Sequence, residues 1–303
     1  MGNKGAKIVC IGSVLWDIIG SAEITLSRAS DVAGRIKTHP GGVAFNIARQ
    51  LGVLGFKSVI LTAFGDDIEG DLLLKQCQDI GMDTQYVFRL EGRRTDQYMA
   101  IEDAGGVVAA IADAFTLEAA GNQLLRPFAD GTLGSARTPF NDILVLDGNL
   151  PAPVLEEIAE SRLFSECDLR LCPASPSKAA RLRPFLGVAN ATFYCNFTEA
   201  QSLCDAKFTD AKSAASGLLK HGAKRAVVTS GNGVVCDRWE AKKAITCRPP
   251  EIDVKKVTGA GDTFMATHLA AELNGYPQQQ ALNLAVDAAA AFVSDQEIQD
   301  VRP

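Results

Sequence analysis

Apolar and polar residues alternate along this chain with two different periods. Short apolar runs typical of buried parallel strands occupy residues 7–11, 58–63, 143–147, 192–195 and 225–230. Between these runs, apolar residues recur at helical spacing, as Val43, Ile47 and Leu51 do. The spacing predicts helices over residues 43–55, 68–80, 154–161, 198–204, 211–221, 260–273 and 278–294. Strands that alternate with helices predict an α/β fold, built on a doubly wound and mostly parallel sheet.

Two segments depart from this alternation. Residues 21–39 are mixed and polar, and residues 90–112 contain stretches of period two, both typical of half-exposed antiparallel strands. They predict a small antiparallel β lid inserted into a single domain that spans residues 1–303. An open lid leaves an unpaired edge and a partly apolar face that a second copy can cover, which predicts a homodimer formed through the lid.

Composition excludes several classes of function. The chain has 303 residues, of which 47% are hydrophobic, and a formal net charge of -6 with no basic run. Binding to a nucleic-acid polymer through a basic face is therefore not expected. No apolar run reaches the length of a membrane span. The eight cysteines include no C-x-x-C pair, which predicts reduced thiols and a cytoplasmic location.

The most informative segment is the glycine-containing stretch 256–264, which precedes an apolar helical segment. Its small residues Gly259, Ala260 and Gly261 let backbone N–H groups approach a ligand closely. Such groups, in the first turn of a helix, bind anions such as phosphate. Asp262 would be misplaced in a pure phosphate site, but it can take a proton from an attacking hydroxyl. The combination predicts phosphoryl transfer from a nucleotide to an alcohol.

By itself, the same stretch also fits a tight turn in which Asp262 stabilises a helix dipole, and the residues alone leave this alternative open. The stretch is not a Walker loop, which requires G-K-[ST]. The first strand is followed by no G-x-G-x-x-G fingerprint, so a dinucleotide-dependent oxidoreductase is a weaker interpretation.

Two motifs together resemble those of the ribokinase-like (PfkB) carbohydrate kinases. One is P-G-G-V-A-F-N-I-A at residues 40–48, and the other is V-T-G-A-G-D at residues 257–262. Their spacing, the early Asp17 and an N-x-x-E element at residues 196–199 also match, so the resemblance covers essentially the whole chain. It implies the fold predicted above and an ATP-dependent kinase that acts on an alcohol. In that kinase Asp262 is the base, and residues 259–261 form the anion site.

The resemblance also implies a sugar-binding site. Asp17, the backbone of Gly41 and Gly42, and the side chain of Asn46 are expected to bind the hydroxyl groups of a sugar. Without the resemblance, Asp17 would be interpreted as a loop or N-cap residue.

A nucleotide and metal site is implied in the same way. Asn196 and Glu199 are expected to organise Mg²⁺ with the nucleotide, Glu199 acting through water. The same two residues also fit a helix cap. The positions expected to contact the nucleotide are Asn196, Thr229, Gly231, Gly233 and Asp287. From the residues alone, segment 229–233 is a hairpin turn and Asp287 lies on an exposed helix face.

Within the family, the chain most resembles pseudouridine kinases, which implies a ribose-containing nucleoside as the substrate. The additional residues expected to contact it are Tyr98, Asp113, Asn149 and Lys178. Phe45 and Tyr98 are expected to frame the base. Free ribose, or another sugar such as 2-keto-3-deoxygluconate, is an alternative substrate. A catalytically silent ligand-binding protein on the same fold is the alternative of a different class.

One residue departs from the family pattern. Many relatives carry an aspartate six residues before the catalytic aspartate, where it helps to hold an activating monovalent cation, but this chain has Lys256 there. An ammonium group would repel K⁺, which argues against activation by a monovalent cation. A solvated lysine without a role is the alternative interpretation.

Overall fold

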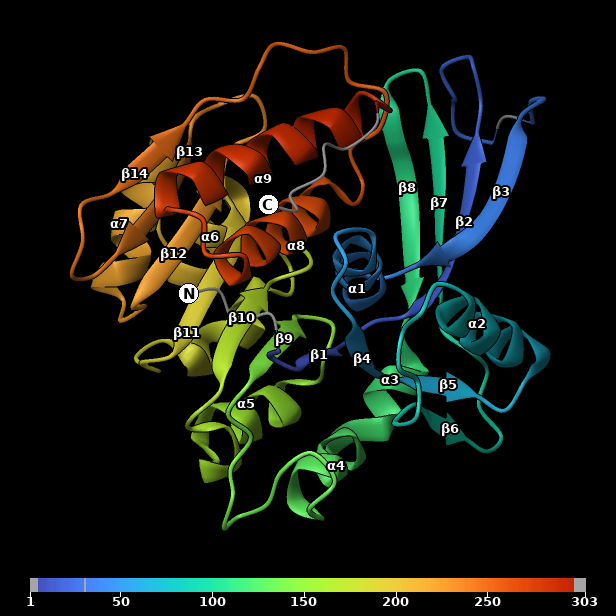
Figure 1. Ribbon diagram of the computed structural model, residues 1–303. Helices are drawn as coiled ribbons and strands as arrows, with labels where there is room; N and C mark the ends of the chain where they lie inside the picture. Colours follow the sequence, from blue (N-terminus) through green and yellow to red (C-terminus); the bar gives the residue numbers. More distant parts are fainter. Residues whose placement is uncertain (1–4, 30, 297–303) are drawn as a thin grey trace.

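The computed structural model of the protein describes residues 5–29 and 31–296, and its centre is an eight-stranded sheet (Figure 1). The strand order is β14-β13-β12-β11-β10-β9-β1-β4. Neighbours from β4 to β12 are parallel, whereas β13 and β14 pair antiparallel. The strands are β1 (Ile8–Ile11), β4 (Ser58–Leu61), β9 (Ile143–Asp147), β10 (Asp168–Cys172), β11 (Ala191–Asn196), β12 (Arg225–Thr229), β13 (Val235–Trp239) and β14 (Ile245–Cys247). This arrangement confirms the doubly wound, mostly parallel sheet.

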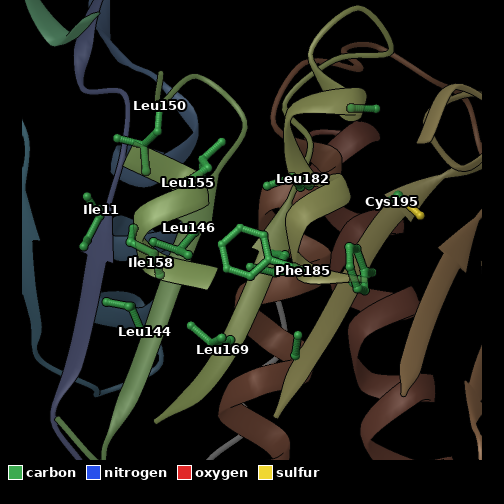
Figure 2. Close-up of a cluster of buried hydrophobic side chains, with 14 of the residues drawn as sticks. Ile11, Leu144, Leu146, Leu150, Leu155, Ile158, Leu169, Leu182, Phe185 and Cys195 are labelled. Carbon is green, nitrogen blue, oxygen red and sulfur yellow. The ribbon is translucent and has the colours of Figure 1, made fainter. Parts of the chain in front are cut away.

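Alternate side chains of the parallel strands belong to two hydrophobic cores, one on each face of the sheet. Ile8 and Cys10 pack in the core that includes residues of α1, α2, α8 and α9, whereas Val9 and Ile11 pack in the core that includes residues of α3 to α7 and η3. Figure 2 shows part of the second core, in which the β9 residue Leu146 lies beside Phe185. Burial on both faces explains why these strands are continuous apolar runs in the sequence.

The seven predicted helices agree with the structure to within a few residues, whereas the short helices α3 and α4 were not predicted. Those of the first core are α1 (Val43–Val53), α2 (Ile68–Asp79), α8 (Ala260–Leu273) and α9 (Gln278–Val293). Those of the second core are α3 (Phe115–Ala120), α4 (Arg126–Ala129), α5 (Ala152–Glu160), α6 (Phe197–Cys204) and α7 (Ala211–Lys220), with the 3₁₀ segments η1 (Gly121–Leu125), η2 (Arg162–Phe164) and η3 (Ala179–Phe185). Among the described residues, no helix combines the length and apolar character needed to span a membrane.

A second sheet stands beside the main one and forms the lid (Figure 1). Its order is β3-β2-β7-β8, with β2 (Leu15–Ser21), β3 (Arg35–Gly41), β7 (Gln97–Asp103) and β8 (Gly106–Asp113). The two outer pairings are antiparallel, and the central pairing of β2 with β7 is parallel. The range 21–39 expected for the first insertion is wrong, because its strands occupy 15–21 and 35–41. Residues 15–19 are mostly apolar and were not separable by pattern from the buried strand before them.

Some elements were not predicted. β10 escaped detection because Asp168 and Arg170 interrupt its apolar run. The short strands β5 (Ala63–Gly65) and β6 (Phe88–Leu90) form a separate parallel pair. The second insertion, expected at residues 90–112, contains the lid strands from Gln97 to Asp113.

Two buried arginines join the main sheet to α8. Arg225 donates to both carboxylate oxygens of Asp237, at 3.0 and 2.8 Å, and to Glu272 Oε1 at 2.5 Å. Arg170 donates to Glu272 Oε2 at 2.6 Å and to the hydroxyl of Tyr194 at 2.8 Å. Burial by itself would raise the pKa of Glu272, but the two guanidinium groups hold it well below its ordinary value. The network fixes the helix whose other end carries the glycine-containing stretch.

We predict that Arg225→Met lowers the free energy of unfolding by about 3–5 kcal/mol, because it leaves a buried charge without its partner. Asp237 is completely buried. Chemical denaturation measures the change, and Lys224→Met is the control, since the Lys224–Glu240 pair is exposed and such pairs contribute about 0–1 kcal/mol. Equal losses in the two variants would contradict the assignment.

Candidate active site

The site is organised where β1 ends, at Gly12 and Ser13. Asp147, the last residue of the adjacent β9, approaches so closely that a Cβ on Gly12 would lie 2.2 Å from Asp147 Oδ2. The same oxygen accepts hydrogen bonds from Ser13 N (2.8 Å) and Ser13 Oγ (3.0 Å). Ser13 Oγ accepts from Val43 N, at the start of α1, and from Asn149 Nδ2, both at 2.9 Å. One serine therefore joins the ends of two strands to the start of a helix.

Lys178, which directly precedes η3, extends this cluster. Its ammonium group donates to Asn149 Oδ1. Burial lowers the pKa of Lys178, and the nearby Asp147 opposes that effect. Burial likewise raises the pKa of Asp147, although hydrogen bonds from Ser13 and Asn149 oppose it. Arg181 holds the loop, with Nη1 at 3.2–3.4 Å from the carbonyl oxygens of residues 148–150.

Asp17 lies on β2, against the glycine pair that ends β3. A Cβ on Gly41 would lie 2.0 Å from Asp17 Oδ2, and one on Gly42 would lie 2.4 Å from the carbonyl oxygen of Ser13. Gly42 also has a φ of 95°, which favours glycine. Burial raises the pKa of Asp17 to about 6, while the charge of His39 acts in the opposite direction. The carboxylate is thus placed to accept hydrogen bonds from hydroxyl groups beside bare backbone.

Asp262 lies in the first turn of α8 and is almost completely buried. Its Oδ2 accepts a hydrogen bond from Asn46 Nδ2 at 2.9 Å. Burial raises the pKa of Asp262 to about 7, and the charges of Asp147, Glu199 and Asp17 act in the same direction, against the hydrogen bond from Asn46. A carboxyl group whose pKa lies near neutrality is suited to accept a proton from a substrate hydroxyl.

The N-terminus of α8 is open to a ligand. Gly259, the N-cap residue, has a φ of 92°, and no side chain caps the helix. A Cβ on Gly261 would meet no other atom within 4 Å, so space remains in front of the first helical turn. Ala260 N donates to the carbonyl oxygen of Val257 at 3.1 Å, whereas the N–H groups of Gly259 and Gly261 have no backbone partner among the described residues and, with the helix dipole, can bind an anion.

Asn196 and Glu199 form a complete capping box at the start of α6. Asn196 Oδ1 accepts from Glu199 N at 2.9 Å, and Glu199 Oε2 accepts from Asn196 N at 2.8 Å. The cap interpretation is therefore confirmed. Glu199 is buried, and burial raises its pKa. One oxygen of Glu199 is used by the cap, and the other has no hydrogen bond within residues 5–29 and 31–296. Among the described residues, no three His, Cys, Asp or Glu side chains are grouped to hold a metal ion.

The remaining residues predicted for the nucleotide lie on β12 beside Asn196, in the turn after β12, and on α9. Thr229 ends β12, and Gly231 and Gly233 belong to the hairpin turn closed by Gly233 N and Ser230 O at 2.7 Å. Gly231 has a φ of 54° and open space at its Cβ position. Asp287 is exposed on α9 and interacts electrostatically with Cys247 of β14.

Three residues predicted for the substrate differ in where they lie. Tyr98 is the cross-strand neighbour of Asp17, on the same face of the lid. Asp113 pairs with Gln97, the residue before Tyr98. Because neighbouring residues of a strand point to opposite sides, Asp113 lies on the face of the lid opposite Tyr98. The expectation that Phe45 frames a base is wrong, because its ring is 4% exposed and belongs to a hydrophobic core. Helical periodicity alone could not tell which flank of α1 the ring would occupy.

Ser13 and Asp147 were not assigned to the site from the sequence. The available signal was a polar residue at the carboxyl end of a buried apolar run, in two strands that prove to be neighbours. Strand order is not readable from the pattern, so the two residues could not be paired in advance.

A family model of the "pfkB family carbohydrate kinase" matches residues 6–303. The chain belongs to the PfkB family of carbohydrate kinases. It is 28% identical over 282 residues to the pseudouridine kinase of Escherichia coli, which covers 92% of this chain and 87% of that protein. It is 28% identical to the guanosine-inosine kinase of Exiguobacterium acetylicum, covering 96% and 95% of the two chains.

The fold is likewise that of a solved ribokinase. The structure of Arabidopsis thaliana ribokinase complexed with ribose and ATP has a TM-score of 0.78, with 19% identity, 98% of this chain covered and 94% of that chain. This PfkB protein is a phosphotransferase that uses an alcohol group as acceptor and acts on small sugar or nucleoside molecules. The alternative of a catalytically silent binding protein is not retained.

We predict that Asp262→Asn keeps the fold but loses turnover by roughly 10²–10⁴-fold, the usual contribution of a general base. In the wild-type protein, kcat/KM should rise with pH through about 7 and then level off, because the base acts only when ionised and the pKa of Asp262 is about 7. Asp253→Asn, at an exposed position before the loop, is the control. Near-normal turnover in Asp262→Asn would contradict the role.

Proposed function

We propose that this PfkB kinase transfers the γ-phosphoryl group of ATP to the 5′-hydroxyl of pseudouridine. The observation that carries the proposal is the buried Asp262, held by Asn46 at the N-terminus of α8 and in electrostatic contact with Asp17. A base, an anion site and a hydroxyl-binding carboxylate therefore share one site. Similarity to a pseudouridine kinase along most of the chain supports the choice of substrate.

The proposed reaction needs few groups. Asp262 accepts the proton of the substrate hydroxyl while that oxygen bonds to the γ-phosphorus, and the bond from this phosphorus to the ADP oxygen breaks. In the 259–261 turn, the N–H groups of Gly259 and Gly261 stabilise the charge on the phosphoryl oxygens, while that of Ala260 holds the turn through Val257. Lys178, whose ammonium group donates a hydrogen bond to Asn149 Oδ1, supplies a second positive charge to the transferred phosphoryl group.

The nucleotide is assigned to the rim formed by Asn196, Thr229, the 231–233 turn and Asp287. Mg²⁺ supplies charge neutralisation to the phosphates when it is bound with the nucleotide. Glu199 fits this ion because its chemistry is oxygen-based and one carboxylate oxygen is not used by the α6 cap.

The sugar is assigned to Asp17, Gly41, Gly42 and Asn46. These groups are suited to hydrogen bonds with the hydroxyl groups of a sugar rather than with a base, so free ribose or another sugar can bind to them equally. A sugar kinase, for example one that acts on ribose or 2-keto-3-deoxygluconate, is therefore the second candidate function.

A substrate panel separates the two candidates. We expect kcat/KM for pseudouridine to exceed that for ribose by several orders of magnitude, because a buried site that hydrogen-bonds a base rejects substrates without one. ADP release should be measured with pseudouridine, uridine, ribose and 2-keto-3-deoxygluconate. If ribose reacts as well as pseudouridine, the nucleoside assignment fails while the kinase assignment stands.

We further propose that the enzyme needs no monovalent cation. Lys256 Nζ donates to Asp295 Oδ1 at 2.8 Å and lies 4.4 Å from the ring centroid of Phe292. The backbone N–H groups of Lys255 and Lys256 both donate to the carbonyl oxygen of Val293. The ammonium group thus supplies positive charge where the loop before the anion site meets the end of α9.

We expect equal kcat/KM in KCl and in tetramethylammonium chloride at the same ionic strength. Lys256→Met should lower kcat/KM, because the loop then loses its ionic contact with α9. Strong stimulation of the wild-type enzyme by K⁺ would contradict this interpretation.

A homodimer through the lid is also proposed. One face of the lid carries Ile36, Met99, Ile101 and Ile111, and Ile36 and Ile111 are 79% and 71% exposed. Their cross-strand register places them on the face opposite Asp17. An exposed apolar patch of this kind is typical of a protein–protein interface.

Light scattering should therefore give the mass of a dimer at micromolar concentration, and Ile111→Glu should shift it towards that of a monomer, because a charge would be buried at the interface. The control is Glu23→Lys, at an exposed position of the lid connection. Ala109→Glu cannot serve as the control, because Ala109 lies on the same apolar face of the lid as Ile111. A monomeric wild-type protein would refute the proposal.

Two further assignments remain proposals. The chain is proposed to act as one catalytic domain with the lid as its insertion. A cytoplasmic location is supported by its eight free cysteines, six of them buried.

A further inference from the structure

Four side chains near the end of β9 form an unbroken chain of hydrogen bonds. Lys178 Nζ donates to Asn149 Oδ1, and Asn149 Nδ2 donates to Ser13 Oγ at 2.9 Å. Ser13 Oγ donates in turn to Asp147 Oδ2 at 3.0 Å. The chain therefore connects a half-buried ammonium group to a fully buried carboxylate, through side chains from three separate segments.

The two ends of this chain fix the direction of every hydrogen bond in it. An ammonium group can only donate, and an ionised carboxylate can only accept. The carboxylate of Asp147 also accepts from the backbone N–H groups of Ser13 and Asn149, both at 2.8 Å, as an ionised group does. The Asn149 amide must therefore turn its oxygen towards Lys178 and its NH₂ group towards Ser13. Hydrogen bonds that run in one direction polarise and strengthen one another.

Ser13 determines which way the Asn149 amide faces. Ser13 Oγ accepts from Val43 N and from Asn149 Nδ2, both at 2.9 Å, and these two bonds use both of its lone pairs. Its single proton is then left for Asp147. Because Val43 begins α1, the backbone of that helix also fixes the position of the hydroxyl group.

Charged groups of both signs surround Lys178. Burial lowers the pKa of its ammonium group, and the charge of Asp147 is the largest effect in the opposite direction. Arg181 lowers the pKa of Lys178 further, whereas Glu118 of α3 raises it. Glu118 is itself paired with Arg181 at 3.3 Å. Asp147, which forms no salt bridge within residues 5–29 and 31–296, is thus the main group that favours the charged form of Lys178.

We propose, on the basis of the kinase function above, that Asp147 and Ser13 are positioning residues, which act through Asn149 to keep the Lys178 ammonium group charged and directed at the transferred phosphoryl group. A half-buried lysine without such partners can change its rotamer or lose its proton. One that is held by an oriented amide is already in place when the nucleotide binds, so no reorganisation is needed during the reaction.

The pH dependence of kcat/KM tests this proposal. Above the plateau that follows the ionisation of Asp262, the wild-type enzyme should lose activity, because the ammonium group is lost as the pH rises through the pKa of Lys178. In Asp147→Asn this alkaline loss should begin at lower pH, since the charge that favours the ammonium group is gone. Lys178→Arg should abolish the alkaline loss, because a guanidinium group stays charged throughout this range.

Ser13→Ala tests the chain without removing a charge. It leaves both backbone donors to Asp147 in place and should lower kcat roughly 10-fold, the usual effect of one lost hydrogen bond, with little change in KM for the alcohol. Its alkaline loss should also begin at lower pH, because the Asn149 oxygen is no longer fixed towards Lys178. Ser58→Ala is the matched control. Ser58 is a buried serine that pairs with Ile8 at the opposite end of β1, and its variant should keep the wild-type pH profile.

The outcomes separate this proposal from a purely structural role and from the choice of substrate. If Asp147→Asn and Ser13→Ala lose stability or turnover but keep the wild-type alkaline loss, the chain only holds the fold and the proposal is wrong. It is also wrong if Lys178→Arg retains the alkaline loss. If Asp147→Asn does not fold, Ser13→Ala decides. The measurements use whichever alcohol of the substrate panel reacts best, so failure of pseudouridine as a substrate refutes that assignment and leaves this test intact.

Discussion

The hydrogen bonds between Ser13 and Asp147 connect the parts of this protein that must meet for it to bind a substrate. Ser13 follows β1, Asp147 ends β9, and Ser13 Oγ also accepts from the first residue of α1. The lid strand β2 begins two residues after Ser13. The position of the lid, the direction of α1 and the loop after β9 that carries Asn149 therefore all depend on one buried polar contact. Because Asp147 is fully buried, the loss of its partner would leave an unsatisfied carboxylate, which is costly.

Four acidic side chains lie in the region around this contact. Asp17, Asp147, Glu199 and Asp262 come from four separate elements, and each is buried enough for desolvation to raise its pKa. The fold tolerates them because the carboxylates are held by backbone or side-chain donors or can take up a proton. The same environment brings the pKa of Asp262 close to neutrality, which suits a base that must be ionised before the reaction and protonated after it. The buried Arg170–Glu272–Arg225 network at the far end of α8 holds that helix in place.

The lid shows how one sheet can present two different surfaces. Its inner face carries polar and charged residues such as Asp17, Tyr98 and Lys37, and its outer face carries large apolar side chains that include Ile36 and Ile111. A period of two makes this division possible, because neighbouring residues of a strand point to opposite sides. The same rule places Asp113 away from Tyr98, although both are polar or amphipathic residues of the lid.

The sequence by itself determined the alternation of strands and helices, the glycine-containing stretch before α8 and the residues Asp17, Asn46 and Asp262. These features are local: they depend on apolar periodicity, on glycine at a turn and on motifs whose members are close in the chain. The order of strands in the sheet, the contact of Ser13 with Asp147 and the burial of Phe45 were decided only by the tertiary structure. Each of these depends on which distant segments become neighbours, and a pattern along one chain does not record that. The strand β10 shows the same limit, because Arg170 looks exposed in sequence and is buried only once Glu272 of α8 neutralises it.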